Sequence, residues 1–214
     1  FEDTQGTFHL KKAENISYLY FPIAGEAGLK SSLTPNLGGD AKIEQNKILL
    51  EPGKAENLVN KRNSRNFWCN VKGIGSWSLT GNAAEALSKK FTEMQDDSEV
   101  TAGFMWQKTT RESKKYQLRG EILSFIPVEK NVEVMLVTIT NTGRMAQTVT
   151  PTAAIPLYGR SADNIRDHRH VTSLLHRIET TDIGVLVTPT LSLEERGHKV
   201  NHMTYYCGGW SGNG

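Results

Sequence analysis

Residues 132–140 read VEVMLVTIT and carry the strongest strand signal in the chain. β-Branched and apolar residues dominate this run, as is typical of a β-strand. Residues 141–143, Asn-Thr-Gly, are a turn signal that ends it. Residues 145–152 alternate in the manner of a return strand, so the sequence predicts a hairpin with a short glycine-containing loop.

Strand patterns continue on the N-terminal side of this hairpin. Residues 116–125 alternate between apolar and polar positions and end at Pro127. Residues 101–108 predict another strand, with Phe104 and Trp106 on one face. This part of the chain is therefore expected to form neighbouring strands of one sheet.

A second hairpin and a late strand complete the pattern. The apolar runs 67–71 and 76–79 flank a Gly-Ile-Gly turn, and residues 184–193 contain a Val-Leu-Val-Thr strand core. Residues 25–53 are rich in Gly, Asn and Pro, and they are interpreted as loops around a short strand at 48–50.

Helical signals are few. Residues 83–91 predict two helical turns, with Asn82 as the N-cap and Glu85 at the third position. Residues 170–178 fit a short helix and the start of a strand equally well, and both interpretations stay open. The predicted fold class is therefore all-β, an antiparallel sandwich with one or two short helices.

The composition excludes several classes of function. The 214 residues carry a net charge of +2, which gives no electrostatic case for nucleic acid, and no apolar run approaches the ~20 residues that span a bilayer. Cys69 and Cys207 are too few for a disulfide framework and are expected to be reduced thiols in the cytoplasm. The start at Phe1 and the end at Gly214 suggest a piece of a longer protein.

The densest polar cluster is residues 158–170, which contain three Arg, two Asp and two His. Arg offers a planar donor fork for hydroxyls, carboxylates or phosphate, and Asp accepts hydrogen bonds from sugar hydroxyls. Loops of this kind on a rigid sheet often bind ligands. The alternative is a solvated loop held by its own Arg–Asp pairs, and the residue types alone leave both open.

A metal site is the weaker interpretation of the same region. It would use His168, His170 and His176 with Asp167, since zinc sites take three such ligands. Arg169 between the first two histidines places an unfavourable charge there. The sequence therefore predicts no metal.

The aromatic residues before the second hairpin also allow two interpretations. Phe67, Trp68 and Trp77 suit the core of a sandwich, and they also suit stacking on sugar rings, with Arg65 facing a ligand or another domain. No pair of carboxylates and no Gly-x-Ser-x-Gly motif identifies a hydrolase. The residues alone thus give a β-rich domain without a reaction.

In order along the chain, four segments resemble the N-terminal domain of the inverting glycoside phosphorylases related to cellobiose phosphorylase, glycoside hydrolase family 94. They are a Trp-Ser hairpin, a Phe-x-Pro strand, a Val-Glu strand with a Thr-Asn-Thr turn, and an Arg-containing loop. The four segments span residues 65–80, 118–128, 132–142 and 163–169.

This resemblance implies a super-β-sandwich over residues 1–214. It also implies that a helical linker and an (α/α)6 catalytic barrel lie outside these residues. The implied reaction is reversible phosphorolysis of a β-glucoside to an α-sugar 1-phosphate with inversion. The implied partners are a β-linked gluco-disaccharide or oligosaccharide and inorganic phosphate as co-substrate, with no other cofactor, in a homodimer. The catalytic residues are expected in the barrel, so none is assigned here.

The resemblance also assigns a substrate-binding role to the polar loop. Arg169 is expected to bind acceptor hydroxyls, and Asp167, His168 and His170 are its expected neighbours in the site. Residues 32–40 and 167–170 depart from the cellobiose-specific pattern. These departures indicate a divergent branch, of the laminaribiose type or another β-glucoside type. The alternatives are a stand-alone carbohydrate-binding sandwich and a dimerisation scaffold.

Overall fold

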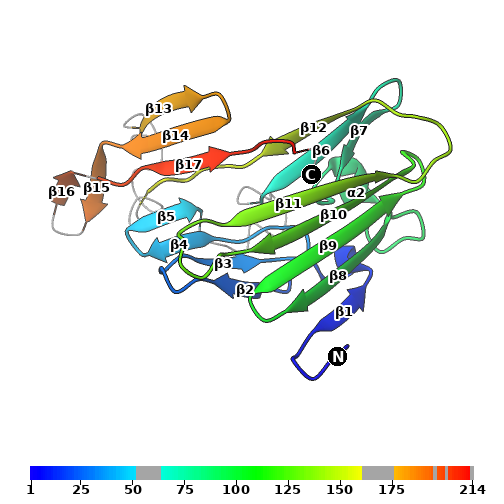
Figure 1. The fold of residues 1–214 in the computed structure, drawn as a ribbon, viewed down its shortest axis with the longest axis horizontal. Coiled ribbons are helices and arrows are strands. Elements are labelled where there is room, and N and C mark those ends of the chain that lie inside the picture. Colours follow the sequence, from blue (N-terminus) through cyan, green and yellow to red (C-terminus); the bar gives the residue numbers. More distant parts are fainter. Residues whose placement is uncertain (52–63, 161–175, 195–196, 201, 213–214) are drawn as a thin grey trace.

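The computed structural model describes residues 1–51, 64–160, 176–194, 197–200 and 202–212 (Figure 1). Nearly all regular structure in these ranges is antiparallel β-sheet. A short helix α2 (Ala84–Ser88) and a 3-10 turn η1 (Ala13–Ile16) are the exceptions in these ranges. The all-β sandwich class is therefore confirmed.

The largest sheet has five strands, and burial alternates along them so that one face lies against the core. β11 is one edge of this sheet in the described part of the chain, and it contains neither proline nor a charged residue. In order across the sheet the strands are β1 (Phe8–Lys11), β8 (Asp97–Gly103), β9 (Trp106–Ser113), β10 (Leu118–Phe125) and β11 (Val134–Asn141).

Two smaller sheets cover the inner face of this layer. One contains β12 (Val149–Ala154), β6 (Asn66–Val71) and β7 (Gly75–Ser78), in that order. The other is a four-stranded meander of β2 (Phe21–Ala24), β3 (Lys30–Leu33), β4 (Ala41–Glu44) and β5 (Lys47–Leu50).

The C-terminal strands form a separate part, at the upper left of Figure 1. β14 (Gly184–Pro189) lies between β13 (His176–Thr181) and β17 (Tyr205–Gly208), and β15 (Leu191–Glu194) pairs with β16 (Gly197–Val200).

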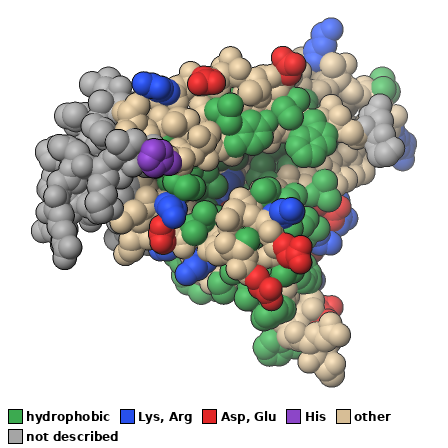
Figure 2. All heavy atoms as spheres, turned by 60° about the vertical axis from the view of Figure 1, so that its left-hand side comes forward, with side chains coloured by type: hydrophobic (Ala, Val, Ile, Leu, Met, Phe, Trp, Pro, Cys, Tyr) green, Lys and Arg blue, Asp and Glu red, His purple; other side chains and the backbone are tan. Residues whose placement is uncertain are grey.

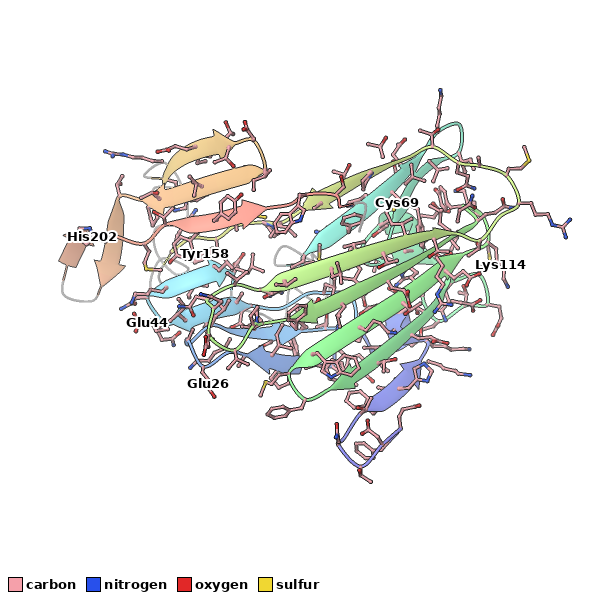
Figure 3. All side chains as sticks on the ribbon, in the orientation of Figure 1. Glu26, Glu44, Cys69, Lys114, Tyr158 and His202 are labelled. Atoms are coloured by element: carbon pink, nitrogen blue, oxygen red, sulfur yellow. The ribbon has the colours of Figure 1, made fainter. Side chains whose placement is uncertain are left out.

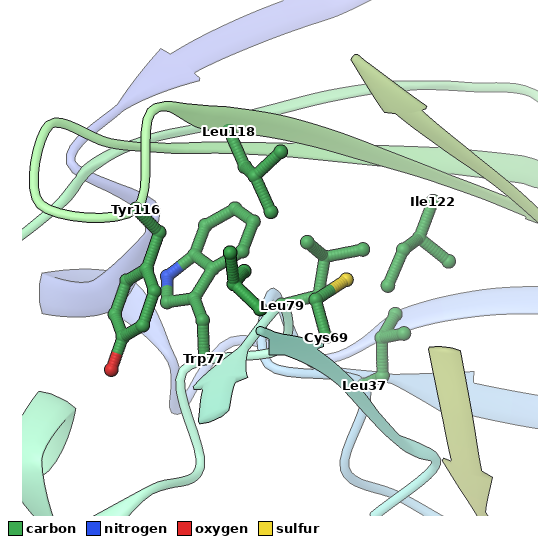
Figure 4. Close-up of a cluster of buried hydrophobic side chains, with 8 residues drawn as sticks. Leu37, Cys69, Trp77, Leu79, Tyr116, Leu118 and Ile122 are labelled. Carbon is green, nitrogen blue, oxygen red and sulfur yellow. The ribbon is translucent and has the colours of Figure 1, made fainter. Parts of the chain in front are cut away.

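The main core lies between the five-stranded sheet and the β12–β6–β7 sheet. Figure 4 shows Leu118 and Ile122 from β10 facing Cys69 and Trp77 from β6 and β7. The layers approach each other closely at Gly120, where an added Cβ would lie 2.0 Å from Cδ1 of Leu79. Glycine is needed here because the neighbouring leucine occupies the space of a side chain.

A buried polar layer continues this inner face beneath β8 and β9. Gln107 donates from Nε2 to the carbonyl oxygen of Thr34 at 3.0 Å, and Arg111 forms an ion pair with Glu14. Asn36 donates to both Glu14 carboxylate oxygens. Thr109 and Asn82 donate to the next two carbonyl oxygens, those of Pro35 and Asn36, so side chains satisfy the irregular backbone of residues 34–36.

The predicted hairpin of residues 132–140 with residues 145–152 is wrong. β11 pairs with β10, whereas β12 pairs with β6 in the opposite sheet, from Val149 opposite Val71 onward. Asn141 ends β11 by donating to the carbonyl oxygen of Met145 at 2.8 Å. The chain then crosses between the layers of the sandwich, where Val149 packs against the core.

Two other strand predictions also differ from the structure. Residues 101–108 span the end of β8 and the start of β9, and Phe104 lies in the turn between them, 82% exposed. Residues 184–193 are divided between β14 and β15, which belong to different sheets. Each segment has the apolar pattern of a single strand, but in each case one strand ends and the next begins within it.

Residues 25–53, predicted as loops around one strand, contain β3, β4 and β5. These strands are only four residues long, which is too short for a clear alternation in the sequence. The helix at 83–91 is confirmed in shorter form, but its N-cap is Ala83, because Asn82 instead binds Asn36 and Asn66. For residues 170–178 the sequence allowed a short helix or the start of a strand, and residues 176–178 are the first residues of β13.

Candidate functional site

The predicted substrate-binding residues Arg169, Asp167, His168 and His170 lie outside the described residues. The structure does describe both ends of the segment that contains them. Residues up to 160 and from 176 onward come together at one place, which we call the junction cluster: Tyr158, Gly159, Arg160, His176 and Tyr205. It lies where β4 and β5 approach β17, near the labels of Glu44 and Tyr158 in Figure 3.

The N-terminal end of the segment is fixed by backbone hydrogen bonds to β5. The Tyr158 amide donates to the carbonyl oxygen of Leu49 at 2.8 Å. Ile48 and Arg160 exchange two bonds, of 3.0 and 3.2 Å, and so form an antiparallel bridge. Residues 158–160 therefore lie along β5 as a short extra strand.

The C-terminal end of the segment is fixed by the β13–β14–β17 sheet. His176 is the first residue of β13 and lies opposite Pro189 of β14. Tyr205 of β17 lies opposite Val187, two residues before Pro189. Since alternate residues of a strand share a face, His176 and Tyr205 point to the same side of this sheet.

Gly159 fits against that side of the sheet. A Cβ at this position would lie 3.4 Å from Tyr205 Cδ2, 3.4 Å from Val187 Cγ1 and 3.8 Å from His176 Cε1. Its φ of +59° is also one that favours glycine. The absence of a side chain thus lets the backbone of one end touch rings that hold the other end.

Arg160 carries a positive charge beside the ring of His176. The Arg160 guanidinium lies over the Tyr158 ring, 5.2 Å from its centroid. Burial lowers the pKa of His176, the Arg160 charge lowers it further, and a hydrogen bond with the backbone of Gly159 opposes both. His176 is therefore neutral at neutral pH.

Tyr205 is also kept neutral. Burial raises the pKa of Tyr205 to about 12, and the negative charge of Glu44 contributes in the same direction. A hydrogen bond with the backbone of Ile48 opposes this rise in the pKa of Tyr205. In the described part of the chain, the buried Nε2 of His176 has no hydrogen-bond partner.

The aromatic and cationic residues near the second hairpin belong to the core. Trp77 is 4% exposed and donates from Nε1 to Asp96 at 2.8 Å, and Phe67 packs against the main core. Arg65 is 3% exposed and pairs with Glu133. The core interpretation is therefore confirmed for Trp77 and Phe67, and the Arg65 guanidinium is buried and paired within the domain.

The Arg65–Glu133 pair is a structural joint. Arg65 Nε and Nη2 donate to the two Glu133 carboxylate oxygens at 2.6 and 2.8 Å, and Nη1 donates to the carbonyl oxygen of Gly39 at 2.7 Å. Ser31 donates to the same carboxylate. This fork ties the turn before β11 to the β3–β4 region.

His176 is the only member of the proposed metal set that the structure describes. Among the described residues, no group of three His, Cys, Asp or Glu side chains is placed to hold a metal ion. In the same ranges, no helix has the length and apolar character needed to cross a membrane.

On the face shown in Figure 2, hydrophobic side chains surround a central hollow. Lys and Arg side chains alternate with Asp and Glu around it, and no large patch of one sign dominates this face. Such a mixed surface suits neutral polar ligands or another protein surface better than a polyanion.

The sequence indicated part of the junction cluster. Tyr158 and Arg160 fall within the polar cluster of residues 158–170 that the sequence singled out. Tyr205 and Glu44 were missed, because they lie far away in the chain and single buried tyrosines have no motif. The one local signal was Gly159, a glycine between two large side chains.

One family model matches well over half of the chain. The model described as the glycosyl hydrolase 94 supersandwich domain matches residues 75–207, from β7 through β17. Among curated proteins, none matches the chain. The matched range includes β13, β14, all but the last residue of β17, and four of the five strands of the largest sheet in full. The chain therefore belongs to glycosyl hydrolase family 94, as its supersandwich domain.

Proposed function

We propose that this chain is the N-terminal domain of a glycoside phosphorylase that cleaves a β-glucoside with inorganic phosphate. The observation that carries the proposal is the family 94 match over residues 75–207. We assign the protein to a divergent branch, of the laminaribiose type or another β-glucoside type. The helical linker and the (α/α)6 barrel belong to the rest of the protein.

The proposed reaction is a direct displacement at the anomeric carbon. A phosphate oxygen attacks from the face opposite the leaving sugar, the glycosidic C–O bond breaks, and a carboxylic acid protonates the departing oxygen. The products are an α-sugar 1-phosphate and the free acceptor sugar. No enzymic base is required, because phosphate is already an anion. We place these catalytic groups in the barrel.

In this proposal the domain supplies the acceptor side of the site. Arg169 binds acceptor hydroxyls, with Asp167, His168 and His170 beside it. Support comes from the junction cluster, which fixes residue 160 on β5 and residue 176 on β14 and so gives the segment between them two anchored ends. The substrates are a β-linked gluco-disaccharide or oligosaccharide and inorganic phosphate, with no metal or organic cofactor.

The remaining partners follow from the same proposal. The domain contributes to a homodimer, in which its acceptor segment reaches the cleft of the partner subunit. Nucleic acid and membranes are not among its partners. Cys69 and Cys207 are both free, which favours the cytoplasm.

The test is phosphorolysis by the intact protein on a panel of β-linked glucose disaccharides. We expect phosphate consumption and an α-sugar 1-phosphate, which NMR of the anomeric proton distinguishes from the β-anomer. Release of reducing sugar without phosphate consumption would indicate a hydrolase. Binding of sugar without any turnover would favour the stand-alone binding sandwich.

A substitution of Arg169 tests its proposed role in acceptor binding. Arg169→Ala removes a charged hydrogen bond, worth about 2 kcal/mol, so the acceptor KM in the synthetic direction rises about thirtyfold. The phosphate KM changes little. Arg177→Ala, an exposed position on β13, is the matched control. An acceptor KM that stays at the wild-type value removes Arg169 from the site.

A further inference from the structure

Trp68 lies beside core residues in β6 but is not itself part of the core. Phe67, Cys69 and Val71 alternate with it along the strand and pack into the main core. Since successive residues of a strand point to opposite faces, Trp68 points to the outer face of the β12–β6–β7 sheet, away from the five-stranded sheet (Figure 1). Trp68 is half-buried there, so part of its indole ring is open to solvent.

The neighbouring strands give this outer face its composition. Residues that lie directly opposite each other in antiparallel strands share a face, and Trp68 lies opposite Ser78 of β7 and Thr152 of β12. The strand positions of this face, which we call the Trp68 face, are Asn66, Trp68, Asn70, Ser76, Ser78, Thr150, Thr152 and Ala154. One large aromatic ring is thus surrounded mostly by amide and hydroxyl side chains.

Hydrogen bonds within the domain orient the amides of the Trp68 face. Asn70 donates from Nδ2 to Ser76 Oγ at 2.9 Å, across the two strands. Asn66 donates to the carbonyl oxygen of Ser64 at 3.1 Å and accepts a bond of 2.8 Å from Asn82. An amide has two donor hydrogens and an acceptor oxygen, so the exposed Asn70 keeps a donor and an acceptor for a ligand.

The Trp68 face is uncharged. None of its residues, all of which the structure describes, is charged, although the chain contains 25 Lys or Arg and 23 Asp or Glu residues. A charged ligand would find no counter-ion among them. In the described part of the chain β12 is an edge of this sheet, and its Pro151 lacks the N–H that strand pairing uses. A neutral ligand rich in hydroxyl groups therefore suits the face better than an added protein strand.

We propose that the Trp68 face is a binding surface for a neutral β-linked glucan. A glucose ring with equatorial hydroxyl groups presents C–H bonds on its two flat sides, and this apolar surface packs on an indole ring. The hydroxyl groups at the rim of the sugar then meet the amides and hydroxyls around Trp68. Indole offers this contact at a low cost in conformational entropy, because two torsions fix its position. The proposed function supplies only the class of sugar, and the binding itself rests on the residues of the face.

The experiment is affinity electrophoresis of the intact protein in native gels that contain a soluble mixed-linkage β-glucan. The glucan is expected to retard the wild type, and Trp68→Ala is expected to raise the dissociation constant about tenfold. Trp68→Phe keeps an aromatic ring, so the rise is expected to be only about threefold. Asn70→Ala removes a hydrogen-bonding group at an exposed position and is expected to raise the dissociation constant about fivefold.

Phe104→Ala is the matched control, because Phe104 is an exposed aromatic residue in the turn between β8 and β9 of the other layer. It is expected to be retarded like the wild type. Because the Trp68 face is uncharged, the wild-type retardation is also expected to stay the same between about 50 mM and about 500 mM salt. A retardation that salt abolishes would contradict the recognition of a neutral sugar.

The variants also decide against the proposal where it is wrong. Equal retardation of the wild type and a folded Trp68→Ala protein overturns it, and so does a wild type that the glucan does not retard. If Trp68→Ala does not fold, wild-type retardation of Asn70→Ala overturns it instead. A folded Trp68→Ala protein that loses self-association in light scattering, with unchanged retardation, would make the face an interface between copies of the chain.

Phosphorolysis of disaccharides by the wild type separates this inference from the proposed function. A wild type that the glucan retards through Trp68, but that consumes no phosphate, contradicts the proposed function and leaves the binding surface standing. A wild type that consumes phosphate, but whose retardation does not depend on Trp68, contradicts the binding surface alone.

Discussion

The buried ion pair of Arg65 and Glu133 joins residues that are 68 positions apart. Their side chains are 3% and 9% exposed. Glu133→Ala leaves the guanidinium buried without its counter-ion, so the free energy of unfolding is expected to fall by about 3 kcal/mol. Urea unfolding followed by tryptophan fluorescence measures this change.

Glu129→Ala is the control for this variant. Glu129 precedes the same strand but is exposed, so its replacement is expected to change stability by less than about 0.5 kcal/mol. Similar losses in both variants would show that the turn before β11, and not the ion pair, is responsible.

Because Tyr205 is buried, we expect the free energy of unfolding to fall at alkaline pH. Its pKa is about 12 in the folded chain against the ordinary 10.0, so the unfolded state loses its proton first as the pH rises. Its contribution is complete below pH 10.0 and is lost as the pH rises through about 12, a decrease of about 2.5 kcal/mol. Urea unfolding of wild type and Tyr205→Phe across this range isolates it, because only the wild type loses this amount.

Tyr18→Phe is the control for Tyr205→Phe, since Tyr18 is 56% exposed. It is expected to show the same alkaline decrease as the wild type. Parallel stability curves for Tyr205→Phe and wild type would refute the argument from burial.

Single residues were the hardest level to predict from the sequence. Arg65 allowed a ligand-facing role because its partner, Glu133, lies in a distant segment. Asn82 has the residue type of an N-cap, yet its amide instead donates to the carbonyl oxygen of Asn36 at 3.0 Å. Both cases depend on tertiary contacts that override a local preference.

At the level of elements, the contact of Gly120 with Leu79 sets the spacing of the two layers. Gly120→Ala would place its Cβ 2.0 Å from Cδ1 of a fully buried leucine, so β10 or β7 must shift. The expected cost is about 2 kcal/mol of unfolding free energy. Thermal and urea unfolding of the variant measure it.

Gly209→Ala is the matched control, because nothing lies within 4 Å of the position that its Cβ would take. Gly120→Ala combined with Leu79→Ala tests the mechanism, since removing the leucine side chain makes room for the added methyl. A double variant whose loss equals the sum of the single losses would contradict a direct clash.

Strands were predicted well where their pattern is long and local, as in β10 and in the β6–β7 hairpin. The partner of β11 was predicted wrongly. The segment that forms β12 has the length and residue types of a return strand, but it pairs in the opposite layer. Periodicity identifies a strand and its buried face. It contains no information on which of two facing sheets receives the next strand.

At the level of the whole molecule, the order of several segments predicted more than any one motif. Three of the four segments that resemble family 94 lie wholly within the matched residues 75–207, and the first, 65–80, lies partly within that range. Together they predicted the family that the match shows. The binding role of residues 167–170 stays a prediction, since these residues fall outside the described ranges.

The uncharged edge of β11 has a practical consequence for anyone who produces this domain alone. Strand edges without lysine or proline invite pairing with other chains, and β11 offers eight such residues. Poor solubility on concentration is the natural outcome, with fibrous or amorphous precipitate formed from folded protein. Lysine in place of the exposed Thr138 or Thr140 is the simplest remedy, because it blunts the edge and leaves the buried face of the strand intact.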